Sequence, residues 1–467
     1  GSYTISNLSG ISIADGSGGA ASNYTLTGGT HNFTVNRRVV SVQGSKTYDG
    51  NTTISTGNIT SVTGTVGSQT LVISGGSGTV SAANVATYSS AAINEGTLTL
   101  GNGANGGLAS NYTLTGHASS SFQINQRVLN SSGSRIYDGS TTASSSDLTL
   151  SNLVGSETLT LSGNGTLANA NVATNKSVTL NTLSIADGSN GGLAANYILA
   201  GGTHNFTVNR RVVGVSGTRL YDATTNAVAS DLSTHANLVG SQTLNLSGTG
   251  TIASKNVGSN KTVSVGTLAL ADGSNGGLAA NYTLTGGTHQ LTVNQRPLNA
   301  TLARQYDGTT ASAGSTLSSF NALQGGETLT MTGSGTAASA NVANGITMSS
   351  NGNLALANGT GAASNYSLNS TVINVTKRVL NSSGSKTYDA NTNALAGAIT
   401  LSNLVSGEAL NHSGTATISS ANAGSYTISN LSGISIADGS GGAASNYTLT
   451  GGTHNFTVNR RVVGVSG

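Results

Sequence analysis

Residues 1–40 read GSYTISNLSGISIADGSGGAASNYTLTGGTHNFTVNRRVV, and the same letters return at residues 424–463. Between the two copies an arginine before an apolar pair, as in NRRVV, recurs at intervals of 82 to 89 residues. A Tyr-Asp pair and an Asn-Tyr pair share this period. A regular period of this length indicates a tandem array in which each repeat contacts mainly its neighbours.

The arginine signature marks the repeat boundaries and falls at Arg38, Arg127, Arg211, Arg296, Arg378 and Arg461. The chain is therefore divided into the closing part of one repeat (1–37), repeats 1 to 5 (38–126, 127–210, 211–295, 296–377 and 378–460) and the start of another (461–467). Because both ends fall inside a repeat, we expect a segment of a longer array. Apolar alternation continues across the boundary at 210–213, which predicts an extended connection rather than a flexible linker.

The composition favours a folded chain with little charge. It includes 66 glycines, one proline, no cysteine and 7% charged residues, yet 36% of the residues are hydrophobic. Disordered chains usually carry more charge or more proline. The absence of cysteine excludes a disulfide framework and thiol catalysis. A net charge of +3 over 467 residues is too small for a nucleic-acid surface, and no apolar run is long enough to span a membrane.

Apolar residues alternate with polar ones over short runs within each repeat. In repeat 2 such runs lie at 148–150, 159–161, 178–185 and 206–208, separated by Gly, Asn, Ser and Asp. This pattern predicts half-buried strands joined by turns. About seven strands in roughly 85 residues fit an all-β array of immunoglobulin-like antiparallel β-sandwiches. A β-solenoid is the alternative, although it would show a shorter period, near 20 residues.

The Tyr-Asp pair is the most regular signature. It falls at Tyr48 and Asp49, Tyr137 and Asp138, Tyr221 and Asp222, Tyr306 and Asp307, and Tyr388 and Asp389. We expect a structural turn in which the carboxylate accepts backbone N–H bonds and the tyrosine packs beside it, rather than a ligand contact. Alanine replaces the following glycine at Ala223 and Ala390, which indicates that a left-handed backbone is not required there.

A second acidic signature, as in IADGS, places Asp15, Asn102, Asp187, Asp272, Asn358 and Asp438 before a glycine. Aspartate-rich glycine turns can bind calcium, but a calcium site needs six to eight oxygens, several of them charged. The whole chain has only 15 acidic residues. A type I′ hairpin turn, in which Asp-Gly and Asn-Gly are interchangeable, is therefore the favoured interpretation, and no metal site is predicted.

Most basic residues lie near the repeat junctions, and one set stands two residues before the signature tyrosine: Lys46, Arg135, Arg219, Arg304 and Lys386. In a strand this spacing predicts that cation and ring share a face. A solvated hinge is favoured over a basic ladder for acidic polysaccharide. The recurrent histidines His31, His204, His289 and His454 lie a repeat apart and are expected to face solvent. Sequons at Asn23, Asn32, Asn111, Asn205, Asn281 and Asn365 make N-glycosylation a hypothesis.

No nucleophile–histidine–acid arrangement recurs, and the chain has no dinucleotide, phosphate-loop or zinc motif. An enzyme needs one special site, whereas this chain repeats one modest unit. We therefore expect no catalytic residues, no cofactor and no enzymatic activity.

Repeats that open RVLNSSGSKTYDANT, continue SNLVGSETLTLSG and close NYTLTGGTHQLTVNQR resemble the YDG-type, glycine-rich repeats of large bacterial surface proteins. They are similar to stalks of filamentous-haemagglutinin-like adhesins exported by two-partner secretion. The resemblance implies an extracellular fibre at the bacterial cell surface or in a biofilm matrix. The expected partners are neighbouring repeats of the chain, with other copies of the chain and surface glycans left open. A self-assembling filament and a carbohydrate-binding array are the alternative functions.

Overall fold

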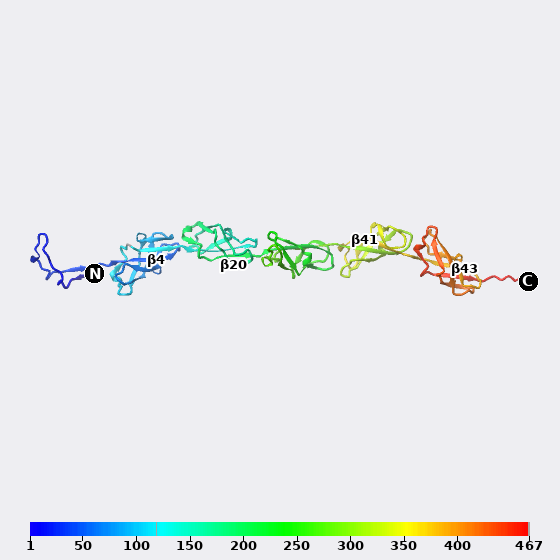
Figure 1. The fold of residues 1–467 in the computed structure, drawn as a ribbon, viewed down its shortest axis with the longest axis horizontal. Helices are drawn as coiled ribbons and strands as arrows, with labels where there is room; N and C mark the ends of the chain where they lie inside the picture. Colours follow the sequence, from blue (N-terminus) through cyan, green and yellow to red (C-terminus); the bar gives the residue numbers. More distant parts are fainter. Residues whose placement is uncertain (118, 466–467) are drawn as a thin grey trace. The chain divides into compact units, whose positions relative to one another are not determined.

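The computed structural model describes residues 1–117 and 119–465, which form two compact units divided between Arg211 and Val212. Each unit consists of strands and single turns of 3-10 helix, so the all-β fold is confirmed. Each repeat is its own group of strands (Figure 1). Within the described residues there is no helix long and apolar enough to cross a membrane.

Repeat 2 illustrates the order of the elements. Its strands are β14 (Arg127–Val128), β15 (Asn130–Ile136), β16 (Thr142–Ser144), β17 (Leu148–Ser151), β18 (Leu159–Ser162), β19 (Asn164–Thr166), β20 (Ala173–Ser177), β21 (Ser184–Asp187), β22 (Tyr197–Ile198) and β23 (His204–Asn209). Single 3-10 turns precede β17 and β22, at η5 (Ser145–Asp147) and η6 (Ala194–Asn196). The predicted strands at 148–150, 159–161 and 206–208 are present, whereas 178–180 lies outside a strand.

The main sheet of repeat 2 has the order β17-β15-β23-β20. β17 pairs with β15, and β20 with β23, in antiparallel fashion, but β15 and β23 run parallel, with Ser131 opposite His204 and Ile136 opposite Asn209. The prediction of a purely antiparallel sheet was therefore wrong. Parallel partners need a long connection, and here the rest of the repeat supplies it.

The same parallel pairing of first and last long strands occurs in every full repeat. The pairs are β4 (Ser41–Thr47) with β13 (Ser121–Asn125), β25 (Gly214–Leu220) with β33 (His289–Asn294), β34 (Arg296–Gln305) with β41 (Tyr366–Thr376), and β43 (Asn381–Thr387) with β50 (His454–Asn459). Because these two strands run in the same direction, the chain enters a repeat at one end of its sheet and leaves at the other. Because the first and last long strands of a repeat pair with each other, each repeat is a closed unit, which a coil of a β-solenoid is not.

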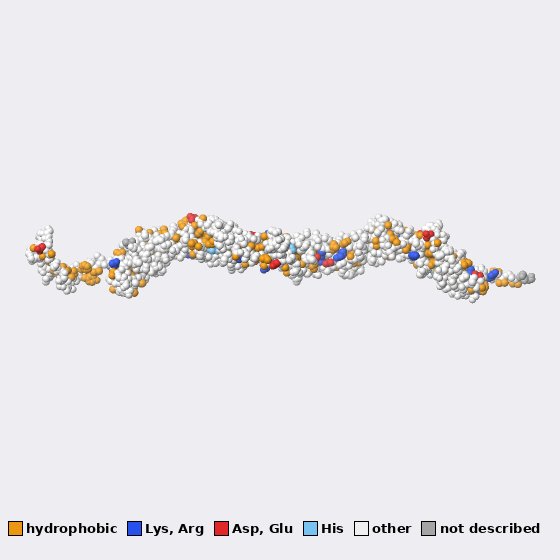
Figure 2. All heavy atoms as spheres, in the orientation of Figure 1, with side chains coloured by type: hydrophobic (Ala, Val, Ile, Leu, Met, Phe, Trp, Pro, Cys, Tyr) orange, Lys and Arg blue, Asp and Glu red, His pale blue; other side chains and the backbone are white. Residues whose placement is uncertain are grey.

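The hydrophobic core of each repeat is small and built from alternating strand residues. In repeat 5 it includes Ile399, Ile418, Ile434, Phe456 and Val458, which come from β45 (Ile399–Ser402), β46 (Leu410–Ile418), β48 (Ile434–Asp438) and β50. Uncharged polar side chains and backbone cover most of the face seen in Figure 2. Because this core is small, contacts at the ends of each repeat contribute to its stability.

Candidate functional site at the repeat junctions

Each signature tyrosine follows the first long strand and stands where the chain leaves the repeat. The backbone N–H of Tyr48 donates to the carbonyl of Asn125, the last residue of β13, at 2.9 Å. The next residue, Asp49, accepts the N–H of Asn51 at 3.1 Å. Asp138, Asp222, Asp307 and Asp389 accept the equivalent N–H groups at 2.9 to 3.2 Å. The aspartate thus holds an Asx turn, as a short polar side chain at such a position can.

The glycine position after this aspartate is left-handed in every full repeat. Gly50, Gly139 and Gly308 have φ of 77° to 79°, and Ala223 and Ala390 have φ of 63° and 66°. The inference that alanine removes the need for a left-handed backbone is therefore wrong. Alanine adopts the same conformation, at a cost of about 1–2 kcal/mol for its Cβ.

The basic residue before the tyrosine lies inside its own loop. The side chains of Lys46, Arg135, Arg219, Arg304 and Lys386 are only 4 to 12% exposed, and each forms an ion pair with the signature aspartate. Arg135 lies 5.4 Å from the ring centroid of Phe206, not against a tyrosine. The prediction of a solvated hinge was therefore wrong for these five residues. The reason is that backbone carbonyls of the turn draw the cation inward.

The signature tyrosine reaches into the next repeat. The hydroxyl of Tyr48 donates to Oε1 of Glu157 at 2.7 Å, and the hydroxyl of Tyr197 donates to Oε2 of the same carboxylate at 2.6 Å. The rings of the two tyrosines meet edge to face, with centroids 5.3 Å apart. Glu157 and Tyr197 belong to repeat 2, so one carboxylate joins two repeats.

The second unit contains this arrangement twice. Tyr221 and Tyr366 donate to Glu327 at 2.7 and 2.9 Å, and Tyr306 and Tyr447 donate to Glu408 at 2.6 Å each. The ring centroids are 5.3 and 5.4 Å apart. We call each set of two tyrosines and one glutamate a junction cluster. Sequence reasoning treated the two tyrosine signatures separately and missed the glutamate, although Glu157, Glu327 and Glu408 share one position of the repeat.

A buried asparagine beside each junction cluster makes two hydrogen bonds to the preceding repeat, and we call this arrangement the asparagine bracket. The Oδ1 atom of Asn196 accepts the N–H of Val85 at 2.9 Å, and its Nδ2 donates to Oδ1 of Asn84 at 3.0 Å. Asn365 and Asn446 make the same two bonds to the repeats that precede them, with equal distances. All three asparagines are 1% exposed. Nothing in the alternation of polar and apolar residues reveals such a bracket, because its partners lie over 100 residues away.

Burial of the bracket also bears on the glycosylation hypothesis. Two of the sequon asparagines, Asn281 and Asn365, are 1% exposed, whereas Asn23 and Asn111 are exposed. A glycan attached to Nδ2 of Asn365 would have no room at this buried atom, which donates to Asn256. The hypothesis is therefore untenable at Asn365 in the closed junction.

The boundary arginines add a backbone contact across the junctions. Arg127 donates to the carbonyl and side chain of Asn152 in its own repeat, at 2.7 and 2.6 Å, and its Nη1 lies 3.5 Å from the carbonyl of Tyr48. Arg378 makes the matching contact with the carbonyl of Tyr306 at 3.4 Å, and Arg296 donates to that of Tyr221 at 2.7 Å. The predicted arginines thus contact the preceding tyrosine loop, whereas Arg38 donates to Gly64 within its own repeat and Arg461 is exposed.

The electrostatics of a junction cluster favour neutral tyrosines around a charged glutamate. Burial, followed by the hydrogen bond to glutamate, raises the pKa of Tyr197 and of Tyr447 to about 12. Burial alone would raise the pKa of Glu327, but hydrogen bonds from Lys255, Tyr221 and Tyr366 outweigh it and lower that pKa. The Lys255 Nζ to Glu327 Oε1 distance is 2.6 Å.

The recurrent histidines of the full repeats lie inside their repeats. His204, His289 and His454 are 5 to 8% exposed, so the expectation that they face solvent was wrong. Nδ1 of His204 lies 2.9 Å from Oγ of Ser131, and Nε2 lies 2.8 Å from the carbonyl oxygen of Leu199. These polar partners make burial of the ring possible. His31, in the incomplete first copy, is half-buried.

The Asp-Gly signature is not the hairpin turn that we expected. The left-handed residues are Asn190 and Gly191, whereas Asp187 ends β21 and accepts the N–H of Ala194 at 2.7 Å. Asn102, Asp15, Asp272, Asn358 and Asp438 accept the equivalent bond. Aspartate and asparagine interchange because both offer this oxygen. Among the residues that the structure describes, no three acidic, histidine or cysteine side chains group as metal ligands would.

The comparison with known proteins places this architecture in a family. The model of the YDG domain matches residues 34–121, 124–204, 207–292, 289–373 and 375–454. No curated protein matches the chain. Since these five matches cover most of the sequence and each contains one Tyr-Asp loop, the chain belongs to the YDG domain family and consists mainly of tandem copies of that domain.

Proposed function

We propose that the chain is a structural segment of an extracellular fibre, the stalk of a large bacterial surface adhesin or biofilm-matrix protein. The observation that carries the proposal is the junction cluster, in which Tyr48 of one repeat and Tyr197 of the next share Glu157. A chain that only linked independent domains would need no buried polar contacts between them. Contacts of this kind restrict how one repeat turns against the next, which is what a fibre that transmits force or sets a distance requires.

The position of these residues within the repeat supports the same proposal. The chain leaves repeat 1 at the end of β13, at the same end as the Tyr48 loop, and Arg127 follows directly. The side chains most dependent on the neighbouring repeat are those that recur most regularly. In this proposal the signature residues serve assembly of the array rather than catalysis or ligand binding.

The proposal is tested by loosening one junction in the full chain. A six-residue Gly-Ser segment inserted between Gln126 and Arg127 separates Tyr48 from Glu157, while the same segment inserted after Asn105, in the equivalent exposed turn of repeat 1, leaves that junction closed. We expect small-angle scattering to show a broader distribution of distances for the first variant only. Equal distributions for wild type and the junction variant would overturn the proposal.

Two further measurements on the full chain separate the other functions. A stalk segment stays monomeric near 45.9 kDa in light scattering. Concentration-dependent polymerisation would replace the stalk by a self-assembling filament. Saturable binding on a glycan array would replace it by a carbohydrate-binding array.

A further inference from the structure

The basic residue of each Tyr-Asp loop is matched to the residue five positions later. Lys46 and Lys386 are followed at that distance by asparagines, Asn51 and Asn391. In the other three repeats an arginine is followed by a hydroxyl residue: Arg135 with Ser140, Arg219 with Thr224 and Arg304 with Thr309. Lysine therefore occurs with asparagine, and arginine with serine or threonine, in every full repeat of the chain.

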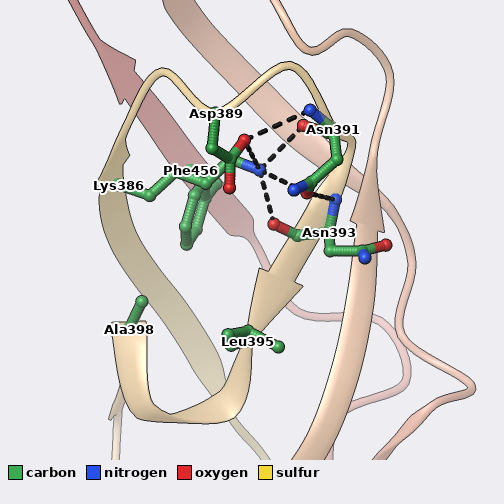
Figure 3. Close-up of a pocket in the computed structure, with 7 residues that line it drawn as sticks. All are labelled: Lys386, Asp389, Asn391, Asn393, Leu395, Ala398 and Phe456. Atoms are coloured by element: carbon green, nitrogen blue, oxygen red, sulfur yellow. Dashed lines mark hydrogen bonds and ion pairs between the residues drawn. The ribbon is translucent and has the colours of Figure 1, made fainter. Parts of the chain in front are cut away.

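The lysine and asparagine side chains are in direct contact. Nζ of Lys46 lies 3.0 Å from Oδ1 of Asn51 and 2.9 Å from Oδ1 of Asp49. In repeat 5, Nζ of Lys386 lies 2.9 Å from Oδ1 of Asn391 and 2.9 Å from Oδ1 of Asp389 (Figure 3). The two lysine side chains are 4% and 12% exposed. Each site thus holds a buried amine against a carboxamide and a carboxylate, and the side chains of Asp49 and Asp389 are 41% and 43% exposed.

Hydrogen bonding alone does not account for the match between lysine and asparagine. Nζ of Lys46 also lies 2.7 Å from the carbonyl oxygen of Asn51 and 3.0 Å from that of Thr53. An ammonium group has three protons, and two carbonyls with the Asp49 carboxylate are already three acceptors. Oδ1 of Asn51 also accepts the N–H of Thr53 at 2.9 Å, but Ser140 makes the equivalent bond at 3.0 Å beside an arginine. A serine would therefore serve the turn equally well.

The chemistry of the side chains explains the match. We propose that Lys46 with Asn51, and Lys386 with Asn391, are sites of intramolecular isopeptide bonds, with Asp49 and Asp389 as proton relays. Arginine cannot take part because its guanidinium stays protonated, and serine and threonine have no carbonyl carbon to attack. The three arginine repeats are thus internal examples of the same loop without the reaction.

The reaction needs no further reagent. The Asp49 carboxylate takes a proton from the Lys46 ammonium, and the free amine attacks Cγ of Asn51. A bond forms between Nζ and Cγ, and the bond between Cγ and Nδ2 breaks. Asp49 returns the proton to the leaving nitrogen, Nζ gives up a second proton, and Nδ2 departs as an ammonium ion, so that Asp49 is again a carboxylate. No atom is oxidised or reduced.

The surroundings in repeat 5 suit this step. A cavity of about 150 Å³ adjoins the site and is lined by Phe456, Leu395 and Ala398 as well as the reacting residues (Figure 3). The apolar walls lie beside the buried lysine, and the cavity is large enough to receive the leaving nitrogen. The resulting ring closes the loop that carries Tyr388, as its equivalent in repeat 1 closes the loop that carries Tyr48. The loop that reaches the next repeat is then held covalently.

Intact mass spectrometry of the full chain tests the inference. Each bond removes one ammonia, about 17 Da, so we expect a mass about 34 Da below that of the unmodified polypeptide. Trypsin should fail to cleave after Lys46 and Lys386, and fragmentation of the peptides that contain these lysines should give no backbone fragments from within the rings 46–51 and 386–391. A mass equal to that of the unmodified polypeptide would overturn the inference.

Substitution separates the bond from other losses of ammonia, such as succinimide formation at an Asn-Gly step. The Lys46→Arg and Lys386→Arg double variant keeps a loop that three repeats already use, so it should fold. Its mass should equal that of its unmodified polypeptide. If the double variant still lacks about 34 Da, the ammonia comes from elsewhere and the inference fails.

Discussion

Residues 1–37 and 424–460 have the same sequence but different surroundings. Tyr24 is 68% exposed and Phe33 60%, whereas Tyr447 and Phe456 are each 1% exposed. Local pairing is the same in both copies: Tyr3 is opposite Phe33 between β1 (Ser2–Thr4) and β2 (Asn32–Thr34), and Tyr426 is opposite Phe456 between β47 (Gly424–Asn430) and β50. The hairpin register is thus local, while burial depends on the rest of the repeat.

The partners of the second copy show where burial comes from. β50 pairs in parallel with β43, and β48 pairs with β46, and both partners come from the first part of repeat 5. Tyr447 packs in a cluster with Ala300, Leu302 and Tyr306 of repeat 4. The closing part of a repeat therefore needs the opening part of its own repeat for its core, and the preceding repeat for its tyrosine.

The largest expected difference between the copies is at the core phenylalanine. Phe456→Ala should destabilise repeat 5 by about 3–5 kcal/mol, because it leaves a cavity among packed side chains. Phe33→Ala removes an exposed ring and should change stability by less than about 0.5 kcal/mol. Hydrogen exchange of the amides in β50 and β2 measures the two changes in stability. Similar effects of the two substitutions would show that the copies are equally packed.

The next effect concerns a junction carboxylate of the kind that Tyr447 contacts. Glu327→Gln removes a charged acceptor for Lys255, Tyr221 and Tyr366 and should weaken the junction between repeats 3 and 4 by about 1–3 kcal/mol. Glu95→Gln, whose partner His117 lies in the same repeat, is the matched control and should leave that junction unchanged. The opening free energy from hydrogen exchange at Val257 reports on it. Equal effects of the two variants would contradict the role of Glu327.

The pH dependence of the junctions follows from the pKa shifts. The pKa values of Tyr197, Tyr366 and Tyr447 are raised from 10.0 to about 12, chiefly by burial, so their contribution is present below pH 10 and lost as pH rises toward 12. The pKa of Glu327 is lowered from 4.5, so its contribution is present above that pH and lost as pH falls. Absorbance of tyrosinate should show these residues ionising later than the exposed ones. Simultaneous ionisation of all tyrosines near pH 10 would contradict the buried clusters.

The smallest effect is expected in the backbone of the Tyr-Asp loop. Ala390→Gly should stabilise repeat 5 by up to about 1 kcal/mol, because glycine adopts the left-handed conformation without cost to a Cβ but is more flexible when unfolded. Gly308→Ala should destabilise, since its Cβ would lie 2.8 Å from Cγ1 of Val405 in the next repeat. Urea unfolding of the two variants gives the sign of each change in the free energy of unfolding. A stabilising Gly308→Ala would contradict the close approach at this junction.

The sequence predicted what depends on short-range pattern. The alternation at 148–150 and 206–208 predicted strands, and the aspartates of the Tyr-Asp loops were expected to hold a turn, as the structure now places them. Prediction failed where a polar residue has a distant partner. His204 was expected in solvent because its partner Ser131 lies 73 residues away, and Asn196 was not singled out because Val85 lies in another repeat. The left-handed φ of Ala223 was missed because composition alone does not reveal a strained backbone.

Hydrogen exchange at single backbone amides tests the contact between repeats most directly. The N–H groups of Val85, Val257 and Val342 each donate to the bracket asparagine of the following repeat at 2.9 Å. We predict slow exchange at all three valines of the native chain, and fast exchange at Val257 in the Asn365→Ala variant, whose side chain no longer accepts this N–H. Fast exchange at the three valines of the native chain would contradict the account, because the repeats would then not be joined in solution.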